Sequence, residues 1–320
     1  MADSSPMISM REVTKTFAGA RSPAVSSLSL DVGAGETLVL VGPSGCGKTT
    51  TMKMINRLVE PSSGTILVDG TDVMSRDPVE LRRRIGYVIQ SVGLLPHRTV
   101  AENIATVPKL VGWDEARTSE RVGGLTEMLE LDRDLLRRYP NELSGGQRQR
   151  VGVARALAAD PPVMLMDEPF GAVDPIVRER LQDQFLNIQS ELRKTIVFVT
   201  HDVDEAIKMA DRIAILNVGG VVEQLASPAE ILSRPANGFV RRFVGQERAL
   251  KRLSLVKVRD VELEQVPGSY AGPSVGRGAS LRQALDAIVA SAGDSVAVTG
   301  ESGEIAGAVM LETIRKELAT

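Results

Sequence analysis

Short apolar runs, each about the length of a strand, recur along the chain. Residues 37–41, 163–166 and 196–199 consist almost wholly of Val, Leu, Ile, Met and Phe, without alternating polar positions. Unbroken apolar runs of this length are typical of strands buried on both faces, as in a parallel sheet. Stretches rich in helix formers lie between them, including 100–110 and 115–131. This order predicts an α/β fold.

The first apolar run leads directly into a glycine-rich loop at residues 42–50, which reads Gly-Pro-Ser-Gly-Cys-Gly-Lys-Thr-Thr. It is a complete G-x-x-x-x-G-K-[ST] motif, and a helix is predicted after it at 51–58. The glycines allow backbone N–H groups to turn inward at a helix N-terminus and form a nest for anions. A turn that only joins two elements is the alternative. The predicted nucleotide-binding residues of this loop are Gly42, Ser44, Gly45, Cys46, Gly47, Lys48, Thr49 and Thr50.

Two carboxylates follow the second apolar run. Asp167 and Glu168 end the predicted strand. If this strand lies parallel to the one before the loop, Asp167 lies beside the phosphates of a bound nucleotide. There it could join the coordination shell of the Mg²⁺ that accompanies the nucleotide, with the Thr49 hydroxyl as a second ligand. Glu168 could then polarise a water for in-line attack on a γ-phosphate. An acidic strand end that faces solvent is the alternative.

A second candidate anion site precedes the second run. Ser144, Gly145, Gly146 and Gln147 begin a predicted helix, where unpaired N–H groups, a hydroxyl and the helix dipole can bind phosphate. The same residues could form only an N-cap, with Ser144 as the cap and Gln147 in the capping-box position. Two phosphate-binding helix starts in one domain suggest two nucleotide surfaces.

These motifs, in this order, resemble the ATP-binding subunits of ABC transporters, and the resemblance covers about residues 8–245. It implies a P-loop ABC ATPase domain at 1–245, with a RecA-like core, an antiparallel β subdomain and a helical lobe at about 91–155. It implies ATP and Mg²⁺ as cofactors. In that family the Ser-Gly-Gly-Gln element of one subunit closes over the γ-phosphate held by the other, so the resemblance also implies a homodimer that sandwiches two ATP.

The resemblance gives further residues a role. Gln90 would contact Mg²⁺ and the attacking water, and His201 the γ-phosphate, with Glu168 as the general base. Asp174 belongs to a loop that crosses the dimer interface, although its neighbour Val173 is more often Leu in the family. Read without the family, Gln90 would be a surface residue and His201 a structural one.

The adenine base is expected to stack on an aromatic side chain. Phe17 occupies the family's stacking position, where Tyr is commoner, and Phe keeps the stacking face. Val25 would pack against the other edge of the base. A plain core position for Phe17 is a competing interpretation. The second histidine, His97, has no comparable context and is expected at the surface.

Composition limits the partners. The net charge of −3 argues against nucleic acid as the main ligand, and the single cysteine fits a reducing compartment. No apolar run approaches the length that spans a bilayer, and the N-terminus lacks the blocks of a signal peptide. Because the chain has no such span, the resemblance to ABC transporters implies separate transmembrane permease subunits, a substrate-binding protein, and a place on the cytoplasmic face of the cell membrane.

A narrower resemblance concerns the solute. The sequence Lys-Met-Ile-Asn-Arg-Leu at 53–58, together with the segment 235–253, resembles the ATPase sequences of importers of glycine betaine, choline and proline betaine. These solutes are osmoprotectants. An importer of amino acids or sugars is the alternative. A soluble ABC ATPase that acts on ribosomes or nucleic acid is a third interpretation. A regulator that does not hydrolyse ATP is a fourth interpretation. The presence of Glu168 and His201, both predicted catalytic residues, argues against it.

The C-terminal seventy residues differ in composition. We expect a linker or degenerate segment at 246–280, rich in Gly, Pro and Ser from 267 onward. Residues 281–320 predict a helix–strand–turn–strand–helix order that resembles a single CBS motif. Such motifs work in pairs, so the segment is either a dimerising module completed by a second chain or a remnant. Sensing of nucleotide or ionic strength is a weaker hypothesis.

Overall fold

The computed structural model describes residues 5–91, 93–171, 173–265, 270, 272–300 and 302–319. The chain folds into two compact units. The first contains Met1–Asp202 and Met209–Leu225, and the second Val203–Lys208 and Ala226–Thr320. No helix in the described part of the chain is long and apolar enough to cross a bilayer.

The first unit is built on a six-stranded sheet with the order β10-β9-β3-β8-β7-β6. Its strands are β3 (Thr37–Val41), β6 (Ile85–Val88), β7 (Val163–Asp167), β8 (Thr195–Val199), β9 (Arg212–Asn217) and β10 (Val221–Ala226). The neighbours from β9 through β3, β8 and β7 to β6 pair in parallel. All residues of β3, β7 and β8 are buried, which confirms the strands predicted from the unbroken apolar runs.

A second sheet of the first unit is antiparallel, with the order β2-β1-β4-β5. It contains β1 (Ile8–Lys15), β2 (Val25–Val32), β4 (Ser63–Val68) and β5 (Thr71–Asp72). Its apolar side chains join those of β3, β7, β8 and β9 in one core. The expected RecA-like core and antiparallel subdomain are therefore both present.

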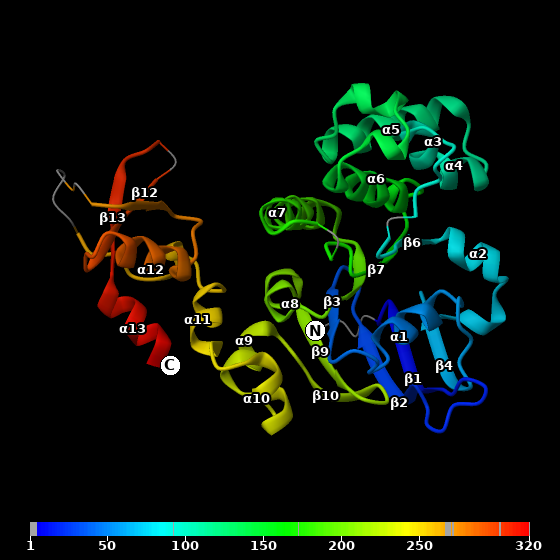
Figure 1. Ribbon diagram of the computed structural model, residues 1–320, viewed down its shortest axis with the longest axis horizontal. Helices are drawn as coiled ribbons and strands as arrows, with labels where there is room; N and C mark the ends of the chain where they lie inside the picture. The colour runs from blue at the N-terminus through cyan, green and yellow to red at the C-terminus, as the bar shows by residue number, and fades with distance from the viewer. Residues whose placement is uncertain are drawn as a thin grey trace. The chain divides into compact units, whose positions relative to one another are not determined.

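Helix α1 (Lys48–Ile55) follows the glycine-rich loop and begins at the lysine, earlier than the predicted start at Thr51. Helix α2 (Pro78–Arg83) lies between β5 and β6, and α7 (Pro175–Leu192) between β7 and β8. The helical lobe contains α3 (Val100–Ile104), α4 (Thr106–Leu110), α5 (Glu115–Met128) and α6 (Gly145–Leu157). Figure 1 shows these four gathered in one lobe.

Two helix predictions in the lobe differ from the structure. The stretch 100–110 forms two short helices instead of one, because Pro108 has no N–H to continue the ladder. The helix at 115–131 ends at Met128, because Glu130 adopts a φ of 49°, which a right-handed helix cannot contain.

The second unit contains α8 (Val203–Met209), α9 (Pro228–Ser233), α10 (Gly238–Val244), α11 (Arg248–Leu253), α12 (Leu281–Ala290) and α13 (Leu311–Ala319). Its three-stranded sheet has the order β11-β12-β13, formed by Ser274–Gly276, Ser295–Thr299 and Ile305–Met310. The predicted helix–strand–strand–helix order after residue 280 is present.

The stretch 246–280 is not a plain linker in the structure. It contributes α11 and β11, and its Leu253 and Val258 are fully buried in the core of the second unit. These apolar side chains are needed there, because a single helix–strand–strand–helix segment has little core of its own. Residues 266–269 and 271 of the predicted linker and Glu301 of the predicted turn lie outside the described residues. The domain boundaries and the CBS resemblance stay predictions.

Candidate active site

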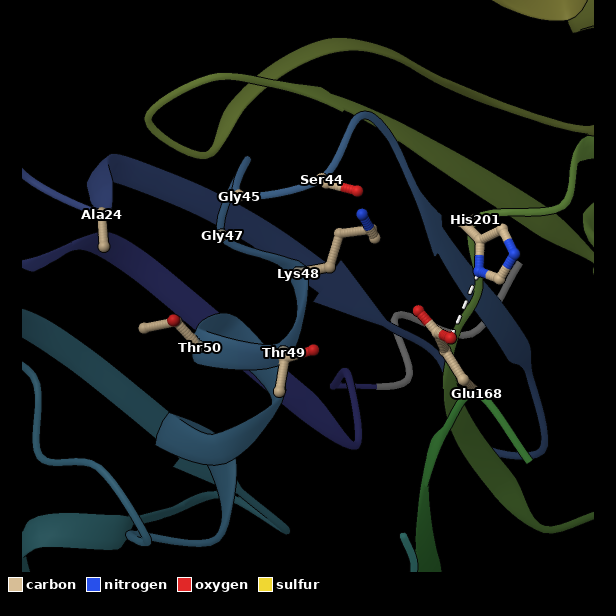
Figure 2. Close-up of a pocket in the computed structure, with 9 residues that line it drawn as sticks. All are labelled: Ala24, Ser44, Gly45, Gly47, Lys48, Thr49, Thr50, Glu168 and His201. Carbon is tan, nitrogen blue, oxygen red and sulfur yellow. Dashed lines mark ion pairs between the residues drawn. The ribbon is translucent and has the colours of Figure 1, made fainter. Parts of the chain in front are cut away.

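Parallel strands bring their carboxyl ends to one edge of a sheet, and the predicted site residues follow four of these ends, those of β3, β6, β7 and β8. A cavity of about 450 Å³ lies there (Figure 2). Nine residues line it: Ala24, Ser44, Gly45, Gly47, Lys48, Thr49, Thr50, Glu168 and His201. The structure thus joins the glycine-rich loop to Glu168 and His201, which are far apart in the sequence.

The loop is shaped by positions that only glycine can fill. Gly47, the N-cap of α1, has a φ of 106°, and a Cβ there would lie 2.6 Å from the Ala24 carbonyl oxygen. A Cβ on Gly42 would lie 2.2 Å from the Leu216 carbonyl oxygen. No side chain caps the N-terminus of α1. Its first N–H groups and the positive end of its dipole therefore remain suited to an anion.

Lys48 lies inside this loop. Its Nζ donates to the carbonyl oxygens of Gly42 at 2.7 Å and Pro43 at 3.1 Å, and the residue is buried. Among the nine lining residues it is the one lysine or arginine. Figure 2 shows Lys48 among the side chains that line the cavity. The loop therefore presents a fixed positive charge to a phosphate chain. Cys46 is buried beneath it, with its Sγ 3.8 Å from Nζ.

Two of the three predicted metal ligands, Thr49 and Asp167, meet at the start of α1, while the third, Gln90, lies against Glu168. The Thr49 hydroxyl donates to Asp167 Oδ1 at 3.1 Å. Burial raises the pKa of Asp167, and the hydrogen bond from Thr49 opposes that rise. Burial, with the charge of Asp167, also raises the pKa of Tyr87 to about 12, so this phenol stays neutral.

A hydroxyl and a carboxylate at this distance fit Mg²⁺, which prefers oxygen ligands and is usually held by one or two carboxylates and the substrate phosphates. The described residues contain no cluster of three or more His, Cys, Asp or Glu suited to a metal. With one hydroxyl and one carboxylate, the donor set at Thr49 and Asp167 suits an ion whose remaining ligands are waters and substrate phosphates.

Glu168 is held by two other predicted residues. Its Oε2 accepts from Gln90 Nε2 at 3.0 Å and lies 3.2 Å from His201 Nδ1. Glu168 has a φ of 44°, which is strained for a residue with a side chain, and its N–H donates to the Val199 carbonyl at 2.9 Å. Figure 2 shows the carboxylate and the imidazole together on one side of the cavity. A carboxylate fixed in this way can orient a water.

The Ser-Gly-Gly-Gln element does not line this cavity. Ser144 caps α6, and Gln147 completes a capping box: the Ser144 N–H donates to Gln147 Oε1 at 2.8 Å, and Gln147 N–H to Ser144 Oγ at 3.2 Å. The predicted capping box is thus present. A Cβ on Gly145 would meet only open space, and one on Gly146 would lie 3.0 Å from Val177.

Asp174 is the N-cap of α7 and accepts from the Val177 N–H at 3.1 Å. Val177 also lies against Gly146, so the starts of α6 and α7 are in contact. Ala172, in the loop before Asp174, lies outside the described residues. Like the α6 start, Asp174 does not line the cavity.

The two residues predicted to hold the base differ in exposure. Phe17 is 44% exposed, so the interpretation as a plain core residue is wrong, and Lys15 Nζ lies 5.1 Å from the ring centroid. Val25 is fully buried and packs against Gly47 and Gly220. It supports the loop from behind and does not present a free surface. His97 is exposed, as expected.

Sequence reasoning missed two contributors. Ala24 lines the cavity, and no side-chain chemistry marks it. The turn between β9 and β10 braces the loop: Gly220 N–H donates to the Cys46 carbonyl at 2.8 Å, and Ser26 N–H to the Gly219 carbonyl at 2.7 Å. The Gly-Gly pair signals a turn, but its contact with the loop is long-range and leaves no local signal.

Comparisons with known proteins agree with this geometry. A family model described as ABC transporter matches residues 25–171. Glycine betaine/carnitine/choline transport ATP-binding protein OpuCA of Bacillus subtilis (strain 168) is 49% identical over 308 residues, which are 96% of this chain and 79% of that protein. Glycine betaine uptake system ATP-binding protein YehX of Escherichia coli (strain K12) is 46% identical over 312 residues, 97% of this chain and 100% of that protein.

A third relative, osmoprotectant import ATP-binding protein OsmV of Salmonella typhimurium (strain LT2), is 57% identical over 272 residues, 84% of this chain and 71% of that protein. Among solved structures, the dimeric post-hydrolysis state of the ATP-binding cassette MJ0796, bound to ADP and Pi, is similar with a TM-score of 0.63. The two chains are 32% identical, and the alignment covers 69% of this chain and 99% of the MJ0796 chain.

The chain therefore belongs to the ABC transporter family. Within it, the chain is an ATP-binding subunit, the class of ABC ATPase that hydrolyses ATP to drive transport. Two of these relatives, OsmV and YehX, are named as ATP-binding proteins of an import and an uptake system.

Proposed function

We propose that the chain energises a bacterial importer of quaternary-amine osmoprotectants such as glycine betaine, choline or proline betaine. The relatives that align along nearly the whole chain carry glycine betaine, carnitine or choline in their names. This likeness carries the choice of solute, because the ATPase itself does not contact it. Separate permease subunits and a substrate-binding protein complete the importer, with this chain at the cytoplasmic face of the membrane.

The observation that carries the catalytic assignment is the double contact of Glu168 Oε2 with Gln90 and His201 at the mouth of the phosphate loop. Glu168 acts as general base and takes a proton from the attacking water. Gln90 and His201 fix the carboxylate and the water, and His201 also contacts the γ-phosphate. The loop from Gly42 to Thr50 holds the phosphates, with Lys48 on the β- and γ-phosphates.

Mg²⁺ belongs beside Thr49 and Asp167, with Gln90 as a further contact. Bound there with ATP, it supplies positive charge that stabilises the transferring phosphoryl group. Phe17 stacks on the adenine, for which its exposed ring is suited.

The active form is a homodimer in which Ser144, Gly145, Gly146 and Gln147 of one chain close over the ATP of the other, with Asp174 at the interface. Two observations support this. The α6 start lies outside the cavity of its own chain, and a solved relative with 32% identity is dimeric.

Glu168→Gln tests the catalytic assignment. The amide keeps the shape but cannot take a proton, so kcat for ATP falls about a thousandfold while ATP still binds. Glu191→Gln, on an exposed position of α7, is the matched control and leaves kcat unchanged. Normal hydrolysis by Glu168→Gln would contradict the role of Glu168 as base.

Uptake tests the solute. Cells that express the chain with its permease subunits and substrate-binding protein are assayed for labelled glycine betaine uptake, with unlabelled choline, proline betaine, maltose and histidine as competitors. Competition by choline and proline betaine alone supports the proposal. Competition by the sugar or the amino acid alone would overturn the osmoprotectant assignment and leave the ATPase assignment intact.

A further inference from the structure

Helix α6 contacts the chain on both sides of Gln90, through two consecutive residues near its C-terminal end. On the side before Gln90, the helix packs closely on β6: a Cβ on Gly86 would lie only 2.7 Å from the Ala156 carbonyl oxygen. On the side after Gln90, Arg155 Nη1 donates to the Gly93 carbonyl oxygen at 2.5 Å. Gln90 is therefore bracketed by one helix.

The Gly93 contact leads back to Gln90 through short contacts. Gly93 N–H donates to the Ser91 carbonyl at 2.7 Å. Gly93 has a φ of 57°, and a Cβ there would lie 2.5 Å from Cδ1 of Ile89, the residue before Gln90. A shift of the Gly93 carbonyl therefore displaces the backbone that carries Gln90, whose amide is 3.0 Å from Glu168.

Arg155 is suited to hold this position. It is half-buried, and burial lowers the pKa of its guanidinium, which nevertheless stays charged near neutral pH. A charged donor makes a stronger hydrogen bond to a carbonyl than a neutral one. Its hydrogen bond to Gly93 joins positions 62 apart in the sequence, so it fixes a tertiary relation rather than a local turn.

The same helix begins at Ser144, and a helix of thirteen residues transmits a displacement of one end to the other. We propose that Arg155 is a positioning residue for Gln90, through which the place of α6 sets the contact between Gln90 and Glu168. This inference rests on the proposed role of Gln90. By this inference, a displacement of the Ser144 end of α6 moves Gln90 of the same chain.

The test is a double-mutant cycle in the full-length chain with Arg155→Met, Gln90→Ala and the double variant. Arg155→Met is expected to lower kcat for ATP about tenfold, with KM changed less than about twofold, because misplacement of a catalytic contact affects the chemical step and not nucleotide binding. In the Gln90→Ala background, Arg155→Met has no further effect, because the group that it positions is already absent.

Arg150→Met is the matched control. Arg150 also projects from α6, but it donates to the carbonyls of Leu129 and Glu130 at the end of α5. It is expected to lower the melting temperature without changing kcat. If Arg155→Met does not fold, Arg155→Lys, which keeps the charge and the aliphatic stem but loses the guanidinium fork, takes its place in the cycle.

Independent, multiplicative losses in the double variant would overturn the inference and leave the proposed function standing. A rise in KM at constant kcat would overturn it as well. A wild-type kcat for Gln90→Ala would instead contradict the proposed role of Gln90, and the inference would fall with it.

Discussion

Two helix starts in this molecule have the composition of an anion-binding site, but they differ in how the N–H groups of the first turn are capped. At α1 the N-cap is Gly47, no side chain bonds the first turn, and Lys48 lies within the loop. At α6 the N-cap is Ser144, and a capping box with Gln147 satisfies the first turn. The first start opens into a cavity of about 450 Å³, which the second does not line.

This difference separates a helix start that can bind phosphate within one chain from a helix start that can only complete the phosphate site of another chain. An uncapped helix start with a lysine beside it can bind phosphate within one chain, because its N–H groups have no competing partner. A capped start already has side-chain partners for these groups. It adds binding energy for phosphate only where a second surface brings the anion to it, as the proposed dimer does.

Of the changes at the two helix starts, removing the charge from the uncapped start has the largest expected effect. Lys48→Met should weaken ATP binding about a hundredfold, the equivalent of one charge-assisted hydrogen bond to phosphate. Equilibrium binding of a fluorescent ATP analogue measures it. Lys109→Met, an exposed lysine of the helical lobe, controls for the lost charge. Equal affinities for both variants would show that the loop does not bind the phosphates.

Asp167→Asn should lower kcat about fiftyfold, because a neutral amide holds Mg²⁺ poorly. The same change should raise the melting temperature of the nucleotide-free chain at neutral pH. Since burial raises the pKa of Asp167 above its ordinary 3.8, the stability that it contributes is present below that value and lost as pH rises through the raised pKa.

The melting difference between wild type and Asp167→Asn should therefore shrink as the pH is lowered toward 3.8. Scanning calorimetry across this range, without ATP or Mg²⁺, measures it. A variant that melts lower than wild type at neutral pH would show that the carboxylate is stabilised, not penalised, by its surroundings.

Ser144 and Ser280 offer a matched pair for the capped start. Both form a capping box with a glutamine three positions on, Gln147 and Gln283. Replacing either by Ala should cost about 1 kcal/mol of stability. Only Ser144→Ala should also lower kcat, by about tenfold, because it removes a donor to the γ-phosphate. An equal effect of both variants on kcat would reduce Ser144 to an N-cap.

The smallest expected effect is at Phe17. Phe17→Ala should weaken ATP binding about fivefold, the low end of what a base stacked on an aromatic ring contributes. Phe17→Tyr should retain the wild-type affinity. Titration with ATP and with inorganic triphosphate distinguishes base from phosphate contacts, and an equal loss for both ligands would exclude stacking.

The parts that sequence could predict are those fixed by local chemistry. Unbroken apolar runs identified β3, β7 and β8, and the strand ending in Asp167 pointed to Glu168, while His201 received its role from the family resemblance. Contacts between distant segments were beyond reach. Ala24 and the Gly219–Gly220 turn support the loop through backbone atoms, and Arg155 reaches Gly93 across 62 positions. The place of Leu253 and Val258 in the core of the second unit depends on residues as distant as Val309 and Ile314, so no local pattern marked it.

The central claim is that each chain carries one open phosphate site whose completion needs the capped start of a second chain. The most direct test is the molar mass of Glu168→Gln in ATP and Mg²⁺, measured by light scattering, with and without a second change, Ser144→Arg. We predict a dimer with one ATP per chain for Glu168→Gln, and a monomer that still binds ATP for the double variant. An ATP-dependent dimer that forms equally well with Arg at position 144 would contradict the account.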